Sequence, residues 1–97
     1  MMIAKQTISL DHQVTQKPGN IASDMDGDKV MLSVENGKYY NLGETGGAIW
    51  ELIEKPAAVR DVVTSLCNEY DVSEEECVKQ VTAFLTQLDE ENLIDVK

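Results

Sequence analysis

Positive charge is scarce in this chain, and the shortage limits what the protein can bind. The 97 residues include 8 Lys and Arg against 18 Asp and Glu, so the formal net charge at pH 7 is −10. This excess of carboxylates would repel the phosphates of DNA and RNA. It is strongest in residues 69–97, where Lys79 and Lys97 are the only cations. We expect no nucleic-acid partner, and an acidic end that keeps the protein in solution or faces a basic peptide.

Histidine and cysteine are also scarce, which argues against a catalytic or metal-binding site. His12 is the only histidine, so a Cys/His or Ser/His catalytic pair is not expected. Cys67 and Cys77 lack the spacing of a CxxC or Cys/His metal motif and fall on the apolar stripes of expected helices. We interpret them as reduced thiols that pack in the core. Glycine-rich phosphate loops are absent too, and we predict a protein that is not an enzyme and has no metal or cofactor.

One acidic segment comes close to a calcium-binding loop. Asp24, Asp26 and Asp28 are followed by Glu35 at the spacing of such a loop. Lys29, however, occupies the position where the sharp turn of the loop needs glycine, and the flanking residues have the pattern of strands rather than helices. We interpret the segment as an acidic hairpin turn.

Long apolar runs are missing, so no segment is expected to cross a membrane. The apolar stretch at residues 1–4 is too short for a signal peptide, and we expect no targeting segment. A cytoplasmic location fits these features best. The length of 97 residues, with 42% hydrophobic and 27% charged residues, is typical of one globular domain.

Alternating apolar residues predict a small antiparallel sheet near the middle of the chain. We expect strands at residues 21–25, 29–35 and 38–42, with a turn at 26–28. Residues 1–20 are expected to be a polar arm, in which the alternation from Thr7 to Leu10 is compatible with one short strand.

Two pairings of the second and third strands are open. A two-residue Asn-Gly turn would pair Val34 with Tyr39, and a three-residue loop would pair Leu32 with Tyr40. We prefer the three-residue loop because it places the apolar residues of both strands on one side of the sheet. These residues are Val30, Leu32, Val34, Tyr40 and Leu42.

Three helices are expected after the sheet, at about residues 45–54, 57–70 and 73–91, from their apolar spacing. Ser73 and Glu76 form a capping box at the start of the third helix. The fold class is therefore α+β and winged-helix-like, with a three-stranded antiparallel sheet followed by three helices in a domain of residues 21–97.

The third helix carries more apolar residues than packing on one neighbour requires. If it lies beside the last strand, which is an edge of the sheet, these residues would wall a groove. An extended peptide could then join the sheet as a fourth strand and place alternate side chains in the groove.

Three segments carry a resemblance to a known family: VMLSV at 30–34, GKYYNL at 37–42 and ETGGAIWELI at 44–53. Together with the spacing of all three helices, they resemble the PqqD-like family over roughly residues 21–96. Many relatives have Asn where this chain has Gly43. Members of the family are the recognition elements (RiPP recognition elements) for leader peptides of ribosomally made, modified peptides.

The chain most resembles the stand-alone leader-binding subunit of split lasso peptide B proteins. That resemblance implies a non-catalytic adaptor that holds the precursor's leader as an added strand between the third strand and the third helix. The adaptor would present the leader to a separate leader peptidase, a cysteine protease, with the cyclase as a further candidate partner. Stand-alone relatives also act as leader-binding chaperones for radical SAM peptide-modifying enzymes, which is the alternative. A general winged-helix protein-interaction domain is a third reading.

The free edge, the wide apolar helix face and the resemblance together give the expected peptide-binding residues. The backbone of residues 38–42 would bond the leader, and side chains of the third helix would line pockets for its apolar anchors. The expected residues are Lys38, Tyr39, Tyr40, Asn41, Leu42, Val78, Val81, Thr82 and Leu85.

Overall fold

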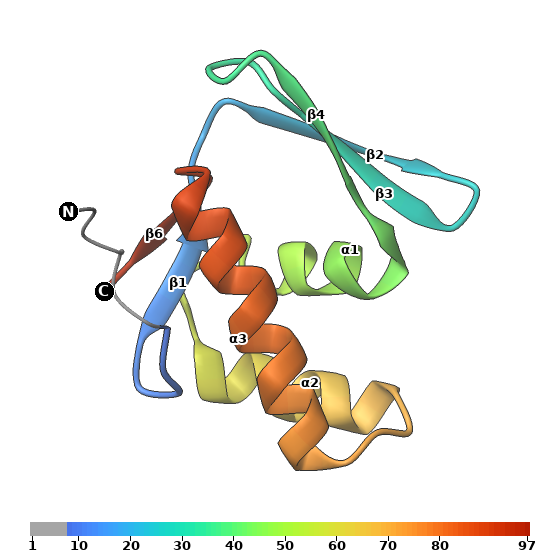
Figure 1. Cartoon of the computed structure of the whole chain (residues 1–97), viewed down its shortest axis with the longest axis vertical. Coiled ribbons are helices and arrows are strands. Elements are labelled where there is room, and N and C mark those ends of the chain that lie inside the picture. The colour runs from blue at the N-terminus through green and yellow to red at the C-terminus, as the bar shows by residue number, and fades with distance from the viewer. Residues whose placement is uncertain (1–7) are drawn as a thin grey trace, which may run out of the picture.

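Two small antiparallel sheets and three helices make up residues 8–97, the part of the chain that the computed structural model describes (Figure 1). One sheet has the strand order β2-β3-β4 and the other has the order β5-β1-β6. The elements are β1 (Gln13–Gln16), β2 (Asn20–Met25), β3 (Asp28–Ser33), β4 (Lys38–Leu42), α1 (Gly43–Leu52), β5 (Ala57–Ala58), α2 (Val59–Glu69), α3 (Glu74–Glu90) and β6 (Ile94–Val96). The expected α+β class, with a three-stranded sheet followed by three helices, is confirmed.

The turn between β2 and β3 forms where the sequence predicts it. Met25 pairs with Asp28, so Asp26 and Gly27 make a two-residue loop. Both have positive φ angles, 54° and 90°. Two consecutive positive φ angles are the signature of a tight hairpin turn that matches the twist of its strands, and Asp-Gly is a favoured pair for it.

The loop between β3 and β4 differs from both expected pairings. Met31 lies opposite Tyr40, which leaves four residues, 34–37, in the loop. The backbone carbonyl of Ser33 accepts the N–H of Gly37 at 2.8 Å, and Gly37 has a φ of 66°. The preferred three-residue loop is therefore wrong, because this hydrogen bond closes a longer turn around a left-handed glycine.

The extra loop residue reverses the two faces of β3. Met31 and Ser33 are buried, with 0% and 1% of their surfaces exposed. Val30 and Leu32, expected on the inner face, are half-buried on the outer face, and Val34 is 64% exposed. A shift of pairing by one residue moves every side chain of a strand to the other side of the sheet.

The N-terminal strand also lies elsewhere than expected. Thr7 is outside the described residues, and residues 8–10 are not part of a strand. The strand is β1, which pairs with β5 on one side and β6 on the other. Val14 is its one buried residue. A strand with a single apolar residue gives almost no alternation to detect.

The three helices pack around a core to which every element except β2 contributes a buried or half-buried apolar side chain. The Ser73 hydroxyl accepts the N–H of Glu76 at 3.2 Å, as the capping box predicts. Cys67 and Cys77 are free, and burial raises the pKa of the Cys77 thiol to about 11. None of the helices in residues 8–97 has the length and apolar character needed to cross a membrane. The most deeply buried helix residues are Ile49, Val59, Val62, Val81 and Leu85.

Gly43 joins β4 directly to α1. Its φ is 72°, in the left-handed region, and the side chain of Asn41 accepts its N–H at 2.9 Å. Glycine and asparagine are the residues that adopt this conformation most easily. The conformation therefore accounts for glycine at this position.

Replacing Gly43 should show whether the free energy of unfolding falls through backbone strain or through a steric clash. A Cβ at this position meets no atom within 4 Å. Gly43→Ala should therefore destabilise the fold by about 1–2 kcal/mol through backbone strain alone, and Gly43→Asn should cost less. Urea denaturation of both variants measures the difference. Equal destabilisation by Ala and Asn would show that the left-handed conformation is not what glycine provides.

Candidate functional site

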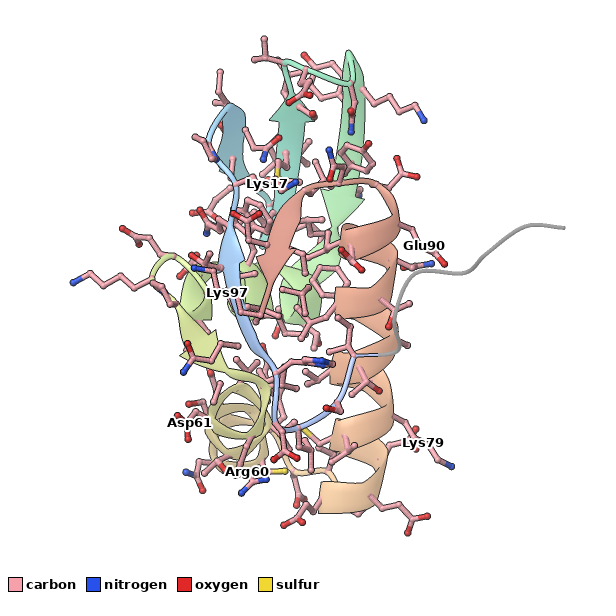
Figure 2. The ribbon with its side chains drawn as sticks, turned by 90° about the vertical axis from the view of Figure 1, so that its left-hand side faces the viewer. Lys17, Arg60, Asp61, Lys79, Glu90 and Lys97 are labelled. Atoms are coloured by element: carbon pink, nitrogen blue, oxygen red, sulfur yellow. The ribbon has the colours of Figure 1, made fainter. Side chains whose placement is uncertain are left out.

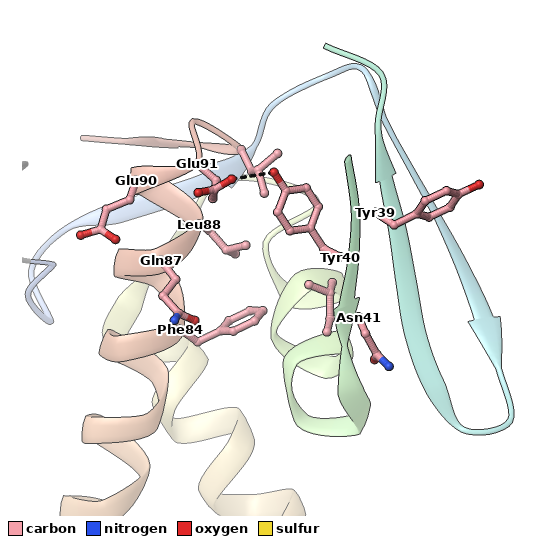
Figure 3. A pocket seen from close by; sticks show the side chains of 10 residues that line it. Tyr39, Tyr40, Asn41, Phe84, Gln87, Leu88, Glu90 and Glu91 are labelled. Atoms are coloured by element: carbon pink, nitrogen blue, oxygen red, sulfur yellow. Dashed lines mark hydrogen bonds between the residues drawn. The ribbon is translucent and has the colours of Figure 1, made fainter. Parts of the chain in front are cut away.

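A groove of about 440 Å³ separates β4 from the C-terminal half of α3 (Figure 3). Its two walls come from segments that lie far apart in the sequence, one before α1 and one at the end of α3. The lining residues are Tyr39, Tyr40, Asn41 and Leu42 on the strand, Phe84, Gln87, Leu88, Glu90 and Glu91 at the helix, and Leu93 after it.

The strand wall of the groove is a free sheet edge. β4 pairs with β3 on one side, and no other strand in residues 8–97 pairs with it. An edge strand presents backbone N–H and C=O groups that can bond another extended chain. The groove therefore combines a hydrogen-bonding edge with side-chain space beside it.

The lower part of the groove, in the view of Figure 3, contains the Phe84 ring with the Gln87 side chain beside it. The Phe84 ring extends from α3 toward β4 and α1. A Cβ built on Gly46 would lie 2.9 Å from this ring and 3.3 Å from the Cβ of Leu42. A larger residue at position 46 would therefore require the Phe84 ring to shift.

A polar cluster joins the two walls at the other end. The Tyr40 hydroxyl donates to a carboxylate oxygen of Glu91 at 2.7 Å, and Lys38 lies 3.6 Å from the same oxygen. The Asn36 side chain donates to the Tyr40 hydroxyl at 3.1 Å and to the Glu91 carbonyl at 3.0 Å. The Tyr40 hydrogen bond, and then the charge of Lys38, lower the pKa of Glu91. This cluster holds the end of α3 against β4.

The expected strand residues all belong to β4, and their side chains alternate. Tyr40 and Leu42 are half-buried on the side of α3. Tyr39 is 76% exposed and points away from the helix (Figure 3). The Asn41 side chain bonds to the start of α1 and thus has a structural role. Lys38 stands at the polar end of the groove.

The expected helix residues do not line this groove, and their part in peptide binding stays a prediction. Val81 and Leu85 have 0% of their surfaces exposed, so they belong to the core. Val78 lines a separate hollow between α2 and the first half of α3, together with Leu10. Thr82 lies on the outer surface of α3, where its hydroxyl donates to the carbonyl of Val78.

The rotation of α3 explains why these residues lie away from the groove. The side facing β4 carries Phe84, Gln87, Leu88 and Glu91, which recur at i, i+3, i+4 and i+7. Leu85 comes one residue after Phe84, and one residue is a rotation of about 100° around the helix. The sequence analysis assigned four helix residues to the groove, and two of them, Val81 and Leu85, are buried in the core. The bulky Phe84 beside the polar Gln87 and Glu91 was the available signal for a groove wall.

The acidic segment before β3 is a hairpin with its own ion pairs. The ammonium of Lys29 lies 3.2 Å from a carboxylate oxygen of Asp24 and 2.6 Å from one of Glu51. The hydrogen bond to Glu51 is the largest cause that raises the pKa of Lys29, and Asp24 raises it further. Within residues 8–97, no three His, Cys, Asp or Glu side chains gather in a way that could hold a metal ion.

The cations of the surface are dispersed rather than gathered. Figure 2 shows Lys17, Arg60, Lys79 and Lys97 on separate parts of the molecule. Arg60 pairs with Asp11 at 2.8 Å. Among the described residues, these side chains form no basic patch of the kind that contacts a phosphate backbone.

One family model and two solved structures are similar to this chain. The family described as "Coenzyme PQQ synthesis protein D (PqqD)" matches residues 28–94. The solved structure of TbiB1 in complex with the TbiA(beta) leader peptide has a TM-score of 0.75 and 25% identity, and it covers 84% of this chain and 94% of TbiB1. A lasso peptide synthetase B1 complexed with the leader peptide has a TM-score of 0.73 and 23% identity, with 84% and 96% covered. No match was found among curated proteins.

The polar cluster predicts how stability depends on pH. A lowered pKa means that Glu91 contributes stability above the ordinary glutamate pKa of about 4.3, and this contribution is lost as the pH falls through the lowered value. Tyr40→Phe should therefore reduce the free energy of unfolding at pH 7, and its difference from the natural protein should shrink at pH 3. NMR titration should show the Glu91 pKa moving back toward its ordinary value.

Tyr39→Phe is the matched control, because the Tyr39 side chain is exposed and contacts no carboxylate of the cluster. It should leave both the stability and the Glu91 titration unchanged. If Tyr40→Phe and Tyr39→Phe behave alike at both pH values, the cluster does not hold α3 against β4.

Proposed function

Because this chain belongs to the PqqD family, we propose that it binds the leader of a ribosomally made precursor peptide and presents it to separate maturation enzymes. The observation that carries the proposal is the groove itself, which sets the free edge of β4 beside the apolar side chains of α3. TbiB1, which is similar over most of both chains, is described as bound to a leader peptide, and this supports the same ligand class here.

The leader would bind as a fourth strand beside β4. Its backbone would pair with the free N–H and C=O groups of Lys38–Leu42, as an added strand does in other peptide-binding sheets. Every second side chain would then point between β4 and α3, because side chains alternate along a strand. Leu42, Phe84 and Leu88 would receive apolar anchors there.

Both the edge and the groove are needed for useful affinity. Three buried apolar anchors contribute roughly 1.5–3 kcal/mol each, or about 5–9 kcal/mol together. Ordering a disordered leader costs about 2–5 kcal/mol. The remainder is short of the about 8 kcal/mol that micromolar affinity requires. About four strand hydrogen bonds at roughly 0.5–1.5 kcal/mol each close the difference.

The proposed partners are the precursor's leader and a separate leader peptidase of the cysteine protease class, with the cyclase as a further candidate. The protein itself would take no part in bond cleavage. In the described residues, His12 hydrogen-bonds to Ser9 on the surface, away from both cysteines in the sequence and outside the groove. The adaptor would act by holding the substrate in an extended form that a second protein can reach.

Phe84→Ser should weaken leader binding by about tenfold or more, because it removes a ring whose burial is worth at least about 1.5 kcal/mol. Val78→Ser is the matched control on the same helix, since Val78 lines a different hollow. It should change leader affinity by less than about twofold. Fluorescence anisotropy of a labelled leader peptide measures both, with helical circular dichroism as the test of folding.

Comparing Val78→Ser with Phe84→Ser also shows which face of α3 the leader contacts. If Val78→Ser weakens binding and Phe84→Ser does not, the leader lies along the side that the sequence predicted, and the groove described here is not its site. If neither variant changes the affinity, binding does not involve this helix.

The adaptor role makes a separate prediction for processing. The purified protein should leave the precursor intact during prolonged incubation. The separate leader peptidase should cleave the precursor faster when the protein is present, and Phe84→Ser should reduce this stimulation. Mass spectrometry of the products measures cleavage. Cleavage by the protein alone would refute the assignment as a non-catalytic adaptor.

A further inference from the structure

The sheet that carries the groove leaves its outer face in solvent. Large apolar side chains remain exposed there, although the inner face of the same sheet is buried around Met31. Figure 1 shows the three helices on the other side of this sheet. The exposed residues of this face are Ile21 at 58%, Met25 at 59% and Tyr39 at 76%, and Val34 in the adjoining loop is 64% exposed.

The pairing of the strands brings part of this set into one row. Ile21 lies opposite Leu32, and Leu32 lies opposite Tyr39. Side chains directly opposite one another on antiparallel strands have Cβ atoms about 4.5–5.5 Å apart. The row therefore forms a continuous apolar band across all three strands, with Val30 half-buried beside it.

The ends of this outer face are acidic. Asp28 belongs to it by alternation along β3, Asp26 lies in the turn at the same end, and Glu35 lies in the loop at the opposite end. All three side chains are exposed. A partner with basic residues around an apolar centre would complement this pattern.

The nearest cations do not offset these carboxylates, because they are occupied elsewhere. Lys29 pairs with Asp24 and Glu51, toward α1. Lys38 lies beside Glu91 at the groove. The outer face thus keeps its negative rim, and a second copy of this chain, also with a net charge of −10, would be repelled by it.

We propose that the outer face of β2–β4, centred on Ile21, Leu32 and Tyr39, docks a second protein whose contact patch is apolar and rimmed by Lys and Arg. The choice of the maturation peptidase as that protein rests on the proposed function. The face itself rests on the exposed row and on its charges.

The outer face alone is smaller than a standard protein interface, and a bound leader would enlarge it. From strand spacing and rise, three strands of five residues cover about 250 Å², whereas a standard interface buries about 800 Å² on each partner. A peptide strand added beside β4 would lie next to Tyr39 and widen the same face. The peptidase should therefore bind the leader-loaded protein more tightly than the empty one.

The test uses the full protein, the purified peptidase and a synthetic leader peptide. Ile21→Ser removes part of the apolar centre, and Asp28→Lys reverses a charge of the rim. Each should weaken peptidase binding in the presence of leader by about tenfold, measured by biolayer interferometry. Asp28→Lys should also reduce the dependence of binding on salt. Both variants should bind the labelled leader as the natural protein does, because they lie on β2 and β3.

Val72→Ser and Asp71→Lys are the matched controls. They lie in the connection between α2 and α3, at the end of the molecule opposite the sheet (Figure 1), and Val72 is 39% exposed. Both should bind the peptidase normally.

Normal peptidase binding by Ile21→Ser and Asp28→Lys would overturn the docking surface, as would absence of binding by the natural protein. Sedimentation that shows a dimer which Ile21→Ser dissociates would overturn it too, because the face would then contact a second copy. Failure of the natural protein to bind the leader is measured separately by anisotropy. That failure would refute the proposed function, whereas normal leader binding with unaffected docking refutes only this inference.

Discussion

The pairing of β3 with β4 is the constraint on which the rest of the structure depends. With Met31 opposite Tyr40, Tyr40 and Leu42 face α3 and line the groove. The same pairing turns Leu32 and Tyr39 outward, where they form an apolar band. A shift by one residue would bury the band and expose Met31, because each side chain would change face. The hydrogen bond from the Gly37 N–H to the Ser33 carbonyl closes the four-residue loop that sets this pairing. The loop therefore determines both the groove and the apolar band.

Two different contacts position β4 and α3 on either side of the groove, a polar one at one end and an apolar one at the other. At one end, Tyr40 and Lys38 hold the Glu91 carboxylate, and this ties the last turn of α3 to the strand. At the other end, Phe84 fits against Gly46, where a larger residue would collide with the ring. Neither contact uses the free backbone edge of β4. The edge and the space beside it therefore exist before any ligand arrives, so binding need not order this part of the protein as well as the peptide.

The sequence predicted the elements of this fold better than it predicted their faces. Alternation and helical spacing located β2 to β4 and the three helices because these patterns depend on local backbone geometry. The face that β3 buries depends on the loop length, and Ser33 as a buried inward residue is invisible to a rule that follows apolar side chains. The same rule chose Val81 and Leu85 for the groove, although the most apolar stripe of a helix packs in the core. β1 depends on partners in β5 and β6, at the far end of the chain, so no local pattern could reveal it.

The sheet has two edges, and their difference explains why only one is suited to a peptide. Along β2, every residue after Asn20 is exposed, so an added strand there would find hydrogen-bond partners but no wall for its side chains. Its end is also acidic at Asp24 and Asp26, and charges at a sheet edge oppose the pairing of further strands. Along β4, α3 supplies the missing wall through Phe84 and Leu88. Strand hydrogen bonds alone leave little free energy for affinity once a flexible chain has been ordered. The position of α3 beside one edge therefore decides where a peptide can bind. The β2 edge has no such wall and is only a margin of the exposed face of the sheet.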